Sequence, residues 1–158
     1  MISHTSFASP YGPLMIGWED ERILFIGPYL EDVPCIPPSG PAIAAMEQLD
    51  EYFRGCRTTF DLPLRFEGTA FQKSVWNALA RIPYGDVRTY SQIAAAIGNP
   101  KAVRAVGQAA NRNPLWILIP CHRVVGQNGT LTGYAGGLAM KQALLDLEKL
   151  HKTSPEAP

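Results

Sequence analysis

Two capping boxes set the start of helices in the second half of this chain. Thr69 is followed three residues later by Gln72, and Thr89 is followed in the same way by Gln92. In a capping box the Thr side chain accepts a hydrogen bond from the backbone of the third helical residue, and the Gln side chain returns one. The first box therefore opens one helix, and the second opens another helix that Gly98 ends.

A third short helix is expected directly after Gly98, so the chain carries a helix-turn-helix candidate. Asn99 is expected to cap this helix and Pro100 to be its first residue, in a helix over residues 101–110. The helix carries Lys101 and Arg104 among small residues, which would let its backbone approach a DNA groove closely. Packing inside a core favours the same small residues, so both interpretations stay open from this pattern alone.

Residues 1–67 have a different pattern of apolar residues, which predicts a small β-sheet with one helix. Residues 2–8, 14–18 and 23–26 are short apolar or alternating runs separated by turn residues, as β-strands are. After a Pro-rich stretch, apolar residues recur at helical spacing along one expected face, namely Ile43, Met46, Leu49 and Phe53.

The residue pattern changes at Gly68 from strand-like runs to helical spacing, which predicts an α/β (α+β) fold with two domains and a tail. Residues 1–67 form a small N-terminal α/β domain of sheet and helix. Residues 68–150 form a mostly helical C-terminal domain with a winged-helix-like helix-turn-helix, and residues 151–158 form a tail.

Charge is unevenly distributed along the chain, although its net charge is zero. Residues 1–67 hold four Lys and Arg against ten Asp and Glu, whereas residues 68–150 hold nine against three. A basic half is typical of a nucleic-acid partner, and two solvated faces that attract each other are the alternative. No apolar run reaches the roughly 18–20 residues of a membrane span, and the N-terminus lacks a signal-peptide pattern. We therefore predict a cytoplasmic protein with no membrane partner.

The stretch IPCHRVV, residues 119–125, places a thiol beside an imidazole. The apolar residues before it predict a buried strand or extended segment, and Pro120 adds a rigid bend, so Cys121 is held in place as a nucleophile requires. If His122 takes its proton, the Cys121 thiol would ionise near neutral pH instead of near its usual pKa of about 8.5. A buried structural cysteine beside a surface histidine is the alternative.

The last expected helix, residues 138–150, carries Glu148 at the end of its apolar stripe. A carboxylate that faces a core needs a partner, because burying it alone is costly. The other two histidines lie near the chain ends, so His122 is the natural partner, and such a pair fixes one imidazole tautomer. A surface ion pair with Lys141 or Lys149 is the alternative, and such pairs contribute little stability.

The remaining cysteines, Cys35 and Cys56, are predicted to be ordinary thiols, because no His, Lys or Cys lies near either in sequence. Three cysteines without close spacing favour neither a disulfide framework nor a metal knuckle. We therefore predict no metal site.

These residues resemble a known family. The stretch Pro120-Cys121-His122-Arg123-Val124 is similar to the active-site signature of the O6-alkylguanine-DNA alkyltransferases, also called methylated-DNA–protein-cysteine methyltransferases. The resemblance extends from Gly68 to Glu148 through the blocks GTAFQKSVW, IPYGDVRTY, KAVRAVGQAANRNP, IPCHRVVGQNG and LTGYAGGLAMKQALL. Agreement in several blocks is far more specific than the signature alone. Residues 1–67 resemble the family only in outline.

The resemblance implies DNA repair by direct reversal in a DNA-binding and alkyl-acceptor domain. A damaged guanine is flipped out from the minor groove of duplex DNA, and its O6-alkyl group passes irreversibly to Cys121, so each molecule acts once. It further implies that His122 is the base through a water, that Glu148 orients His122, that Asn113 braces the active-site turn, and that Tyr90 donates a hydrogen bond to the departing guanine.

The resemblance also implies how this domain contacts DNA. Arg104 fills the gap left by the flipped base, and Val124, Tyr134 and Ala135 line the base pocket. Further DNA-contact residues are Thr89, Lys101, Ala102, Val103, Ala105, Gly107 and Arg112. The minor groove carries a degenerate code, which suits a protein that repairs damage in any sequence.

The implied partner is double-stranded DNA containing alkylated guanine, bound by a monomer without metal or cofactor. Whether O4-alkylthymine is also repaired stays open. Two other classes are alternatives, namely a DNA-binding module without chemistry and a cysteine hydrolase. The intact set of Cys121, His122 and Glu148 argues against the first, and Arg104 in a helix-turn-helix argues against the second.

Overall fold

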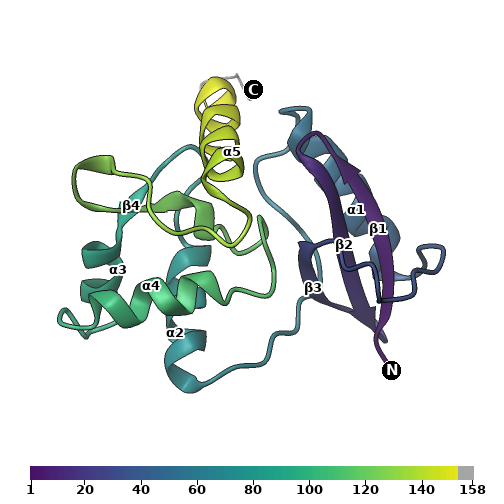
Figure 1. Ribbon diagram of the computed structural model, residues 1–158, viewed down its shortest axis with the longest axis horizontal. Coiled ribbons are helices and arrows are strands. Elements are labelled where there is room, and N and C mark those ends of the chain that lie inside the picture. Colours follow the sequence, from purple (N-terminus) through teal and green to yellow (C-terminus); the bar gives the residue numbers. More distant parts are fainter. Residues whose placement is uncertain (153–158) are drawn as a thin grey trace. The chain divides into compact units, whose positions relative to one another are not determined.

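The computed structural model describes residues 1–152, and the chain divides into two compact units (Figure 1). The first unit comprises residues 1–66 together with residues 114–116. The second comprises residues 67–113 and the chain from Ile117 onward. Each unit is thus made of two separate stretches of the sequence.

The first unit contains a three-stranded antiparallel sheet in the order β1-β2-β3. The strands are β1 (Ser3–Ser9), β2 (Gly12–Glu19) and β3 (Arg22–Pro28), joined in succession by tight turns. Helix α1 (Pro41–Phe53) packs beside this sheet (Figure 1). The predicted small β-sheet with one helix, and with it the α/β class, is confirmed.

The buried face of α1 differs from the predicted one. Ile43 was expected on the inner face, but 48% of it is exposed. The buried stripe is instead shifted to Pro41, Ala42, Ala45, Leu49 and Tyr52. Small alanines let the helix approach the sheet closely, and Tyr52 supplies the bulk that a pattern restricted to large aliphatic residues misses.

A segment from the middle of the second half joins this sheet. The backbone nitrogen of Ile26 donates to the carbonyl of Pro114, and the nitrogen of Trp116 donates to the carbonyl of Ile26, both at 2.9 Å. The pairing is parallel, and Leu115 between these two residues is fully buried. The predicted apolar run is therefore divided, since its next residue, Ile117, belongs to the second unit and has a left-handed backbone with φ of 74°.

The second unit is mostly helical, as predicted. Its helices are α2 (Ala70–Ala80), α3 (Tyr90–Ala96), α4 (Val103–Asn111) and α5 (Leu138–His151). Both predicted capping boxes are formed, with all four reciprocal hydrogen bonds between 2.8 and 3.1 Å. These local signals determine where α2 and α3 begin, and both helices contact α4 (Figure 1).

Helix α4 begins later than predicted. Its N-cap is Ala102, which has no side-chain capping bond. Asn99 does not cap the helix, because residues 99–102 form a turn in which the nitrogen of Ala102 donates to the carbonyl of Asn99 at 3.0 Å. Lys101 therefore lies in the turn before α4, whereas Arg104 lies in its first helical turn and is exposed.

The winged-helix detail is not confirmed. Among the described residues, the strands of the second unit are β4 (Arg88–Thr89) and β5 (Val124–Val125), which pair in parallel. Two short 3-10 helices, η1 (Cys121–Arg123) and η2 (Gln127–Gly129), flank β5. Most of the predicted tail, residues 153–158, lies outside the described residues.

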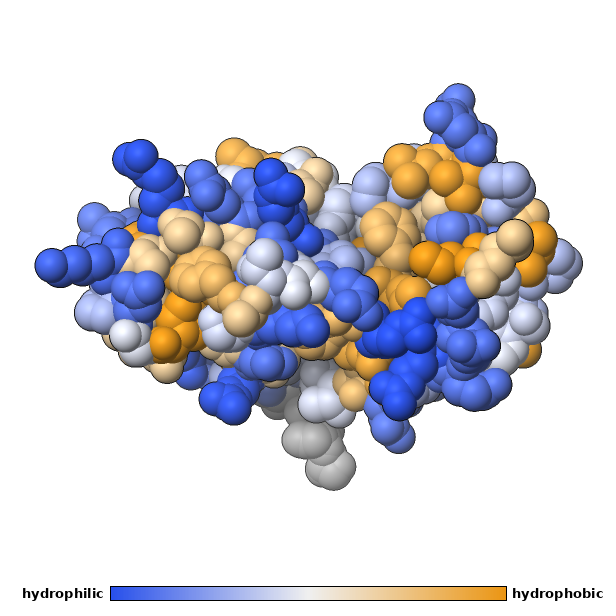
Figure 2. All heavy atoms as spheres, turned by 90° about the horizontal axis from the view of Figure 1, so that it is seen from below, coloured by the Kyte–Doolittle hydropathy of each residue, from blue (hydrophilic) through white to orange (hydrophobic). Residues whose placement is uncertain are grey.

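The exposed surface mixes residue types. On the face shown in Figure 2, hydrophobic groups are interrupted by hydrophilic residues. Within residues 1–152, none of the helices combines the length and the apolar character that a membrane span requires.

Candidate active site

The sulfur of Cys121 is held in a tight turn within the second unit. Cys121 is the first residue of η1, and only 4% of it is exposed. The side-chain amide of Asn113, just after the end of α4, donates to the Ile119 carbonyl at 2.7 Å and to the Cys121 sulfur at 3.1 Å. Asn113 is itself buried, so this amide fixes both the turn and the sulfur.

The Cys121 thiol is protonated in this arrangement. Burial raises its pKa to about 11, and the hydrogen bond from Asn113 and the charge of Lys141 offset only part of that rise. Burial of the sulfur therefore disfavours the thiolate in this state, and ionisation near neutral pH stays a prediction that depends on proton transfer to His122.

His122 and Glu148 meet in the interior. The Nε2 atom of His122 lies 2.6 Å from Oε2 of Glu148, and both residues are fully buried. The buried stripe of α5, which includes Met140 and Leu144, directs the Glu148 carboxylate inward, so the surface-pair alternative does not hold. Since a carboxylate accepts, Nε2 carries the proton, and Nδ1 is left as the basic nitrogen.

The His122 Nδ1 atom is buried and has no hydrogen-bond partner among the described residues. Burial lowers the pKa of His122 despite the opposing effect of Glu148. Burial alone would raise the pKa of Glu148, but hydrogen bonds and charges from His122 and Arg123 outweigh it and lower that pKa to about 2. The pair is therefore a neutral imidazole beside an ionised carboxylate.

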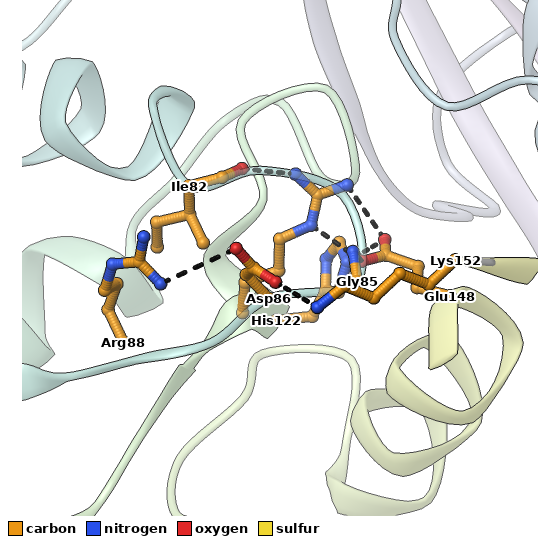
Figure 3. A network of polar contacts seen from close by, with 8 residues as sticks. Ile82, Gly85, Asp86, Arg88, His122, Glu148 and Lys152 are labelled. Atoms are coloured by element: carbon orange, nitrogen blue, oxygen red, sulfur yellow. Dashed lines mark hydrogen bonds and ion pairs between the residues drawn. The ribbon is translucent and has the colours of Figure 1, made fainter. Parts of the chain in front are cut away.

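Arg123 completes the network around this carboxylate and was not predicted as a site residue. Its Nε donates to Oε1 of Glu148 at 2.7 Å, and its Nη2 donates to Oε2 at 3.0 Å. The backbone nitrogen of Gly85 donates to Oε1 at 3.2 Å, so the turn after α2 is also attached to Glu148 (Figure 3). The sequence did carry a signal for Arg123, because a charged residue within the apolar stretch IPCHRVV needs a buried partner.

A second ion pair ties the same turn to the end of α5. Asp86 accepts from Lys152, and its carboxylate lies 4.0 Å from Arg88. Figure 3 draws both ion pairs. These contacts fix the turn that carries Gly85, and they do so at the surface rather than in the interior.

Lys141 is a further buried cation. It is not the surface partner of Glu148 that the alternative requires, because it is fully buried, and its Nζ donates to the carbonyls of Thr132 and Gly133 at 2.9 and 3.3 Å. Burial lowers its pKa to about 8. It thereby holds the loop before α5 against the helix.

The predicted DNA-contact residues gather around α4. A hollow of about 310 Å³ is lined by residues that include Tyr90, Arg104, Gly107 and Gly133. The Tyr90 hydroxyl donates to the Thr132 carbonyl at 2.9 Å.

The predicted DNA-contact residues outside this hydrogen bond differ in exposure. The exposed ones include Lys101, Val103 and Arg112, and the half-buried ones include Thr89, Ala102 and Ala105. Gln108 and Asn111 also line the hollow, and nothing in their spacing marks them in the sequence.

The predicted base-pocket residues differ in how far they are exposed to solvent. Val124 and Tyr134 are buried, whereas Ala135 is exposed. Val124 pairs with Arg88 through β4 and β5, directly after the turn that holds Cys121. Within residues 1–152, His, Cys, Asp and Glu do not gather in groups of three or more that could hold a metal ion.

The state of the Cys121 thiol can be tested with iodoacetamide. At pH 8 we expect Cys35 and Cys56, which are exposed, to be modified at least about a hundredfold faster than Cys121, because a pKa of about 11 leaves about one Cys121 thiol in a thousand ionised. Peptide mass mapping over time gives the three rates. The difference should vanish in denaturant, and equally fast modification of Cys121 in the folded protein would contradict the assignment.

Comparison with known proteins gives the family. Residues 70–150 match the family described as 6-O-methylguanine DNA methyltransferase, DNA binding domain, and residues 2–66 match 6-O-methylguanine DNA methyltransferase, ribonuclease-like domain. A methylated-DNA–protein-cysteine methyltransferase of Methanosarcina acetivorans is 51% identical over 148 residues, covering 90% of this chain and 95% of that protein. The constitutive enzyme of that name from Bacillus subtilis is 50% identical over 160 residues, covering 95% and 97%.

Solved structures agree with this result. The crystal structure of Mycobacterium tuberculosis OGT in complex with DNA is 43% identical, covers 94% of both chains and superposes with a TM-score of 0.88. The crystal structure of the O6-methylguanine methyltransferase from the same organism is 42% identical, with a TM-score of 0.88 over 96% of this chain and 94% of that chain. The resemblance inferred from the sequence is confirmed, and the chain belongs to the family of methylated-DNA–protein-cysteine methyltransferases.

Proposed function

We propose that this protein repairs DNA by moving the methyl group of O6-methylguanine to the sulfur of Cys121. The observation that carries the proposal is the buried Cys121 sulfur, held 3.1 Å from the Asn113 amide in the turn that also carries the buried His122–Glu148 pair. In the reaction the O–CH3 bond breaks and an S–CH3 bond forms. The thiol proton passes to the departing guanine by way of His122, so no other reactant is needed.

His122 is suited to be the base in this transfer. Glu148 holds the proton on Nε2, so the lone pair of Nδ1 is available to take the Cys121 proton, directly or through a water. Asn113 keeps the sulfur in place while its charge develops, because an amide N–H stabilises a thiolate more than a thiol. Ionisation then occurs during the reaction rather than before it, which fits a resting thiol pKa of about 11.

Tyr90 is suited to assist the departing guanine. Its hydroxyl donates to the Thr132 carbonyl beside the hollow next to α4, so it can exchange that acceptor for a guanine atom once a base enters. Val124, Tyr134 and Ala135 remain the proposed pocket residues.

We further propose that α4 enters the minor groove and that the damaged base is flipped out of the duplex. Arg104 is exposed in the first turn of α4, next to small residues that allow close approach to DNA. The relative from Mycobacterium tuberculosis, at 43% identity, has been solved with DNA, which supports DNA as the partner. Use of each molecule once, action as a monomer and a cytoplasmic location remain predictions, and repair of O4-alkylthymine stays open.

The proposal is tested by incubating the protein with a duplex oligonucleotide that carries O6-methylguanine and then measuring the intact protein mass. We expect a gain of one CH2 per protein molecule, located on Cys121 by peptide mapping, and restoration of guanine in the DNA. DNA binding with an unchanged protein mass would instead indicate a binding module, and turnover of an ester substrate would indicate a hydrolase.

Arg104→Ala should separate base flipping from chemistry. We expect it to slow methyl transfer from duplex DNA by about tenfold or more, because the flipped state loses the side chain that fills the stack, while reaction with free O6-benzylguanine changes by less than about twofold. Single-turnover rates on the two substrates give this comparison. Equal losses on both would exclude the proposed role of Arg104.

A further inference from the structure

Arg123 holds both oxygens of the carboxylate that His122 contacts. Besides the two bonds to Glu148, its Nη1 donates to the carbonyl of Ile82 at 2.7 Å, and the Tyr84 ring lies 5.7 Å from its Cζ atom. Only 8% of the side chain is exposed. A guanidinium held at three points in the interior is fixed in orientation, unlike the arginine of a surface ion pair.

The Glu148 carboxylate has a cationic partner other than His122. The titratable groups that act on His122 or on its carboxylate partner are Glu148, Lys141, Arg123, Tyr84 and Tyr134. Both phenols stay neutral, because burial raises their pKa values. The opposite charges of Arg123 and Glu148 are in direct contact, so the carboxylate is already compensated. Without such a partner, a buried carboxylate would draw a second proton onto the imidazole.

We propose that Arg123 is a positioning residue that keeps His122 neutral, with its proton on Nε2 and its lone pair on Nδ1. The inference rests on the proposed function, because only a neutral imidazole can take the proton of Cys121. Arg123 acts through Glu148, whose two oxygens it shares with His122. Burial, together with the charges of Arg123 and Lys141, holds the pKa of His122 below its ordinary value against the effect of Glu148.

The first test uses the unchanged protein and needs no reaction. The chain has three histidines, His4, His122 and His151, so protein labelled with ring 15N histidine gives an NMR spectrum that is simple to assign. We expect His122 to be neutral and protonated on Nε2 at pH 7, because burial holds its pKa below the ordinary value. An imidazolium at pH 7 would overturn the proposal.

Two substitutions then test Arg123 directly. Arg123→Met removes the charge, and we expect the midpoint of the His122 titration to rise by about one pH unit or more, with methyl transfer slowed about tenfold near pH 6 and less than about threefold near pH 9. Arg123→Lys keeps the positive charge but lacks the planar guanidinium that contacts both carboxylate oxygens. We expect it to restore most of the native His122 titration and of the native pH dependence of methyl transfer. Arg81→Met, at an exposed arginine just after α2, is the matched control and should change neither measurement.

A folded Arg123→Met protein with an unchanged titration and an unchanged pH profile would refute the positioning role. If this variant fails to fold, Arg123→Gln takes its place, because it also removes the charge but keeps a hydrogen-bond donor for Glu148. A raised midpoint of the His122 titration in it supports the role, and an unchanged midpoint refutes the role. If the titrations are as expected but Cys121 gains no methyl group, the proposed function fails while the effect of Arg123 on His122 stands.

Discussion

Cys121→Ser will accept no methyl group from O6-methylguanine in DNA, whereas Cys35→Ser and Cys56→Ser will react at the native rate. A serine hydroxyl ionises far less readily than a thiol and is a much weaker nucleophile toward carbon, so the same base cannot activate it. The two control cysteines are exposed and lie in the first unit, outside the turn that Asn113 braces. Intact-protein mass after incubation with the damaged duplex measures the result.

DNA binding provides the check on this variant. Ser is smaller than Cys, and its hydroxyl can still accept from Asn113, so Cys121→Ser should fold and bind the damaged duplex with an affinity within about threefold of the native protein. Methyl transfer that persists in Cys121→Ser and is lost in Cys35→Ser or Cys56→Ser would place the acceptor elsewhere.

Glu148→Gln will both destabilise the protein and slow methyl transfer. The native carboxylate accepts from His122, from two nitrogens of Arg123 and from Gly85. A neutral amide leaves the Arg123 charge buried without its partner, and breaking a buried pair in this way costs about 3–5 kcal/mol in free energy of unfolding. We expect a transfer rate at pH 7 lower by about tenfold or more, since the amide can no longer anchor the His122 tautomer.

The pH dependence of unfolding isolates the contribution of Glu148. Its pKa is about 2 in the folded protein against an ordinary value of 4.5, so its stabilising effect is complete above pH 4.5 and is lost as the pH falls from there toward 2. Urea unfolding should show this loss in the native protein and a smaller loss in Glu148→Gln. Asp146→Asn is the matched control, because Asp146 is exposed on the same helix and accepts a hydrogen bond from Gln142 at 2.8 Å. A Glu148→Gln protein as stable and as fast as this control would rule out the network.

The parts of the fold that the sequence predicted are those with local causes. The helix starts at Thr69 and Thr89 were predictable because each capping box completes its hydrogen bonds within four residues. The start of α4 was not, because the turn at residues 99–102 competes with the cap that Asn99 offers. Likewise, the face of α1 depends on how closely alanines let the helix approach the sheet, which spacing alone does not define.

In the candidate site, too, the features with local causes could be predicted and the others could not. The meeting of His122 with Glu148 was predictable because a carboxylate on an apolar stripe requires a partner and the chain offers few. Arg123 was missed, since its role depends on reaching across to α5 and to Ile82 at once. The rise in the pKa of the resting Cys121 thiol could not be predicted, because the extent of burial is a property of the folded interior and not of the residues beside it in sequence.

The path of residues 114–116 has a consequence for engineering this protein. Leu115 pairs with Ile26 in the sheet of the first unit, and it lies between Asn113 and Cys121, which both belong to the second unit. The two halves are therefore not interchangeable modules. A chimera that joined residues 1–66 to the second half of a relative would insert a foreign edge segment into this sheet, so recombination would have to carry the sheet and its three-residue insert together.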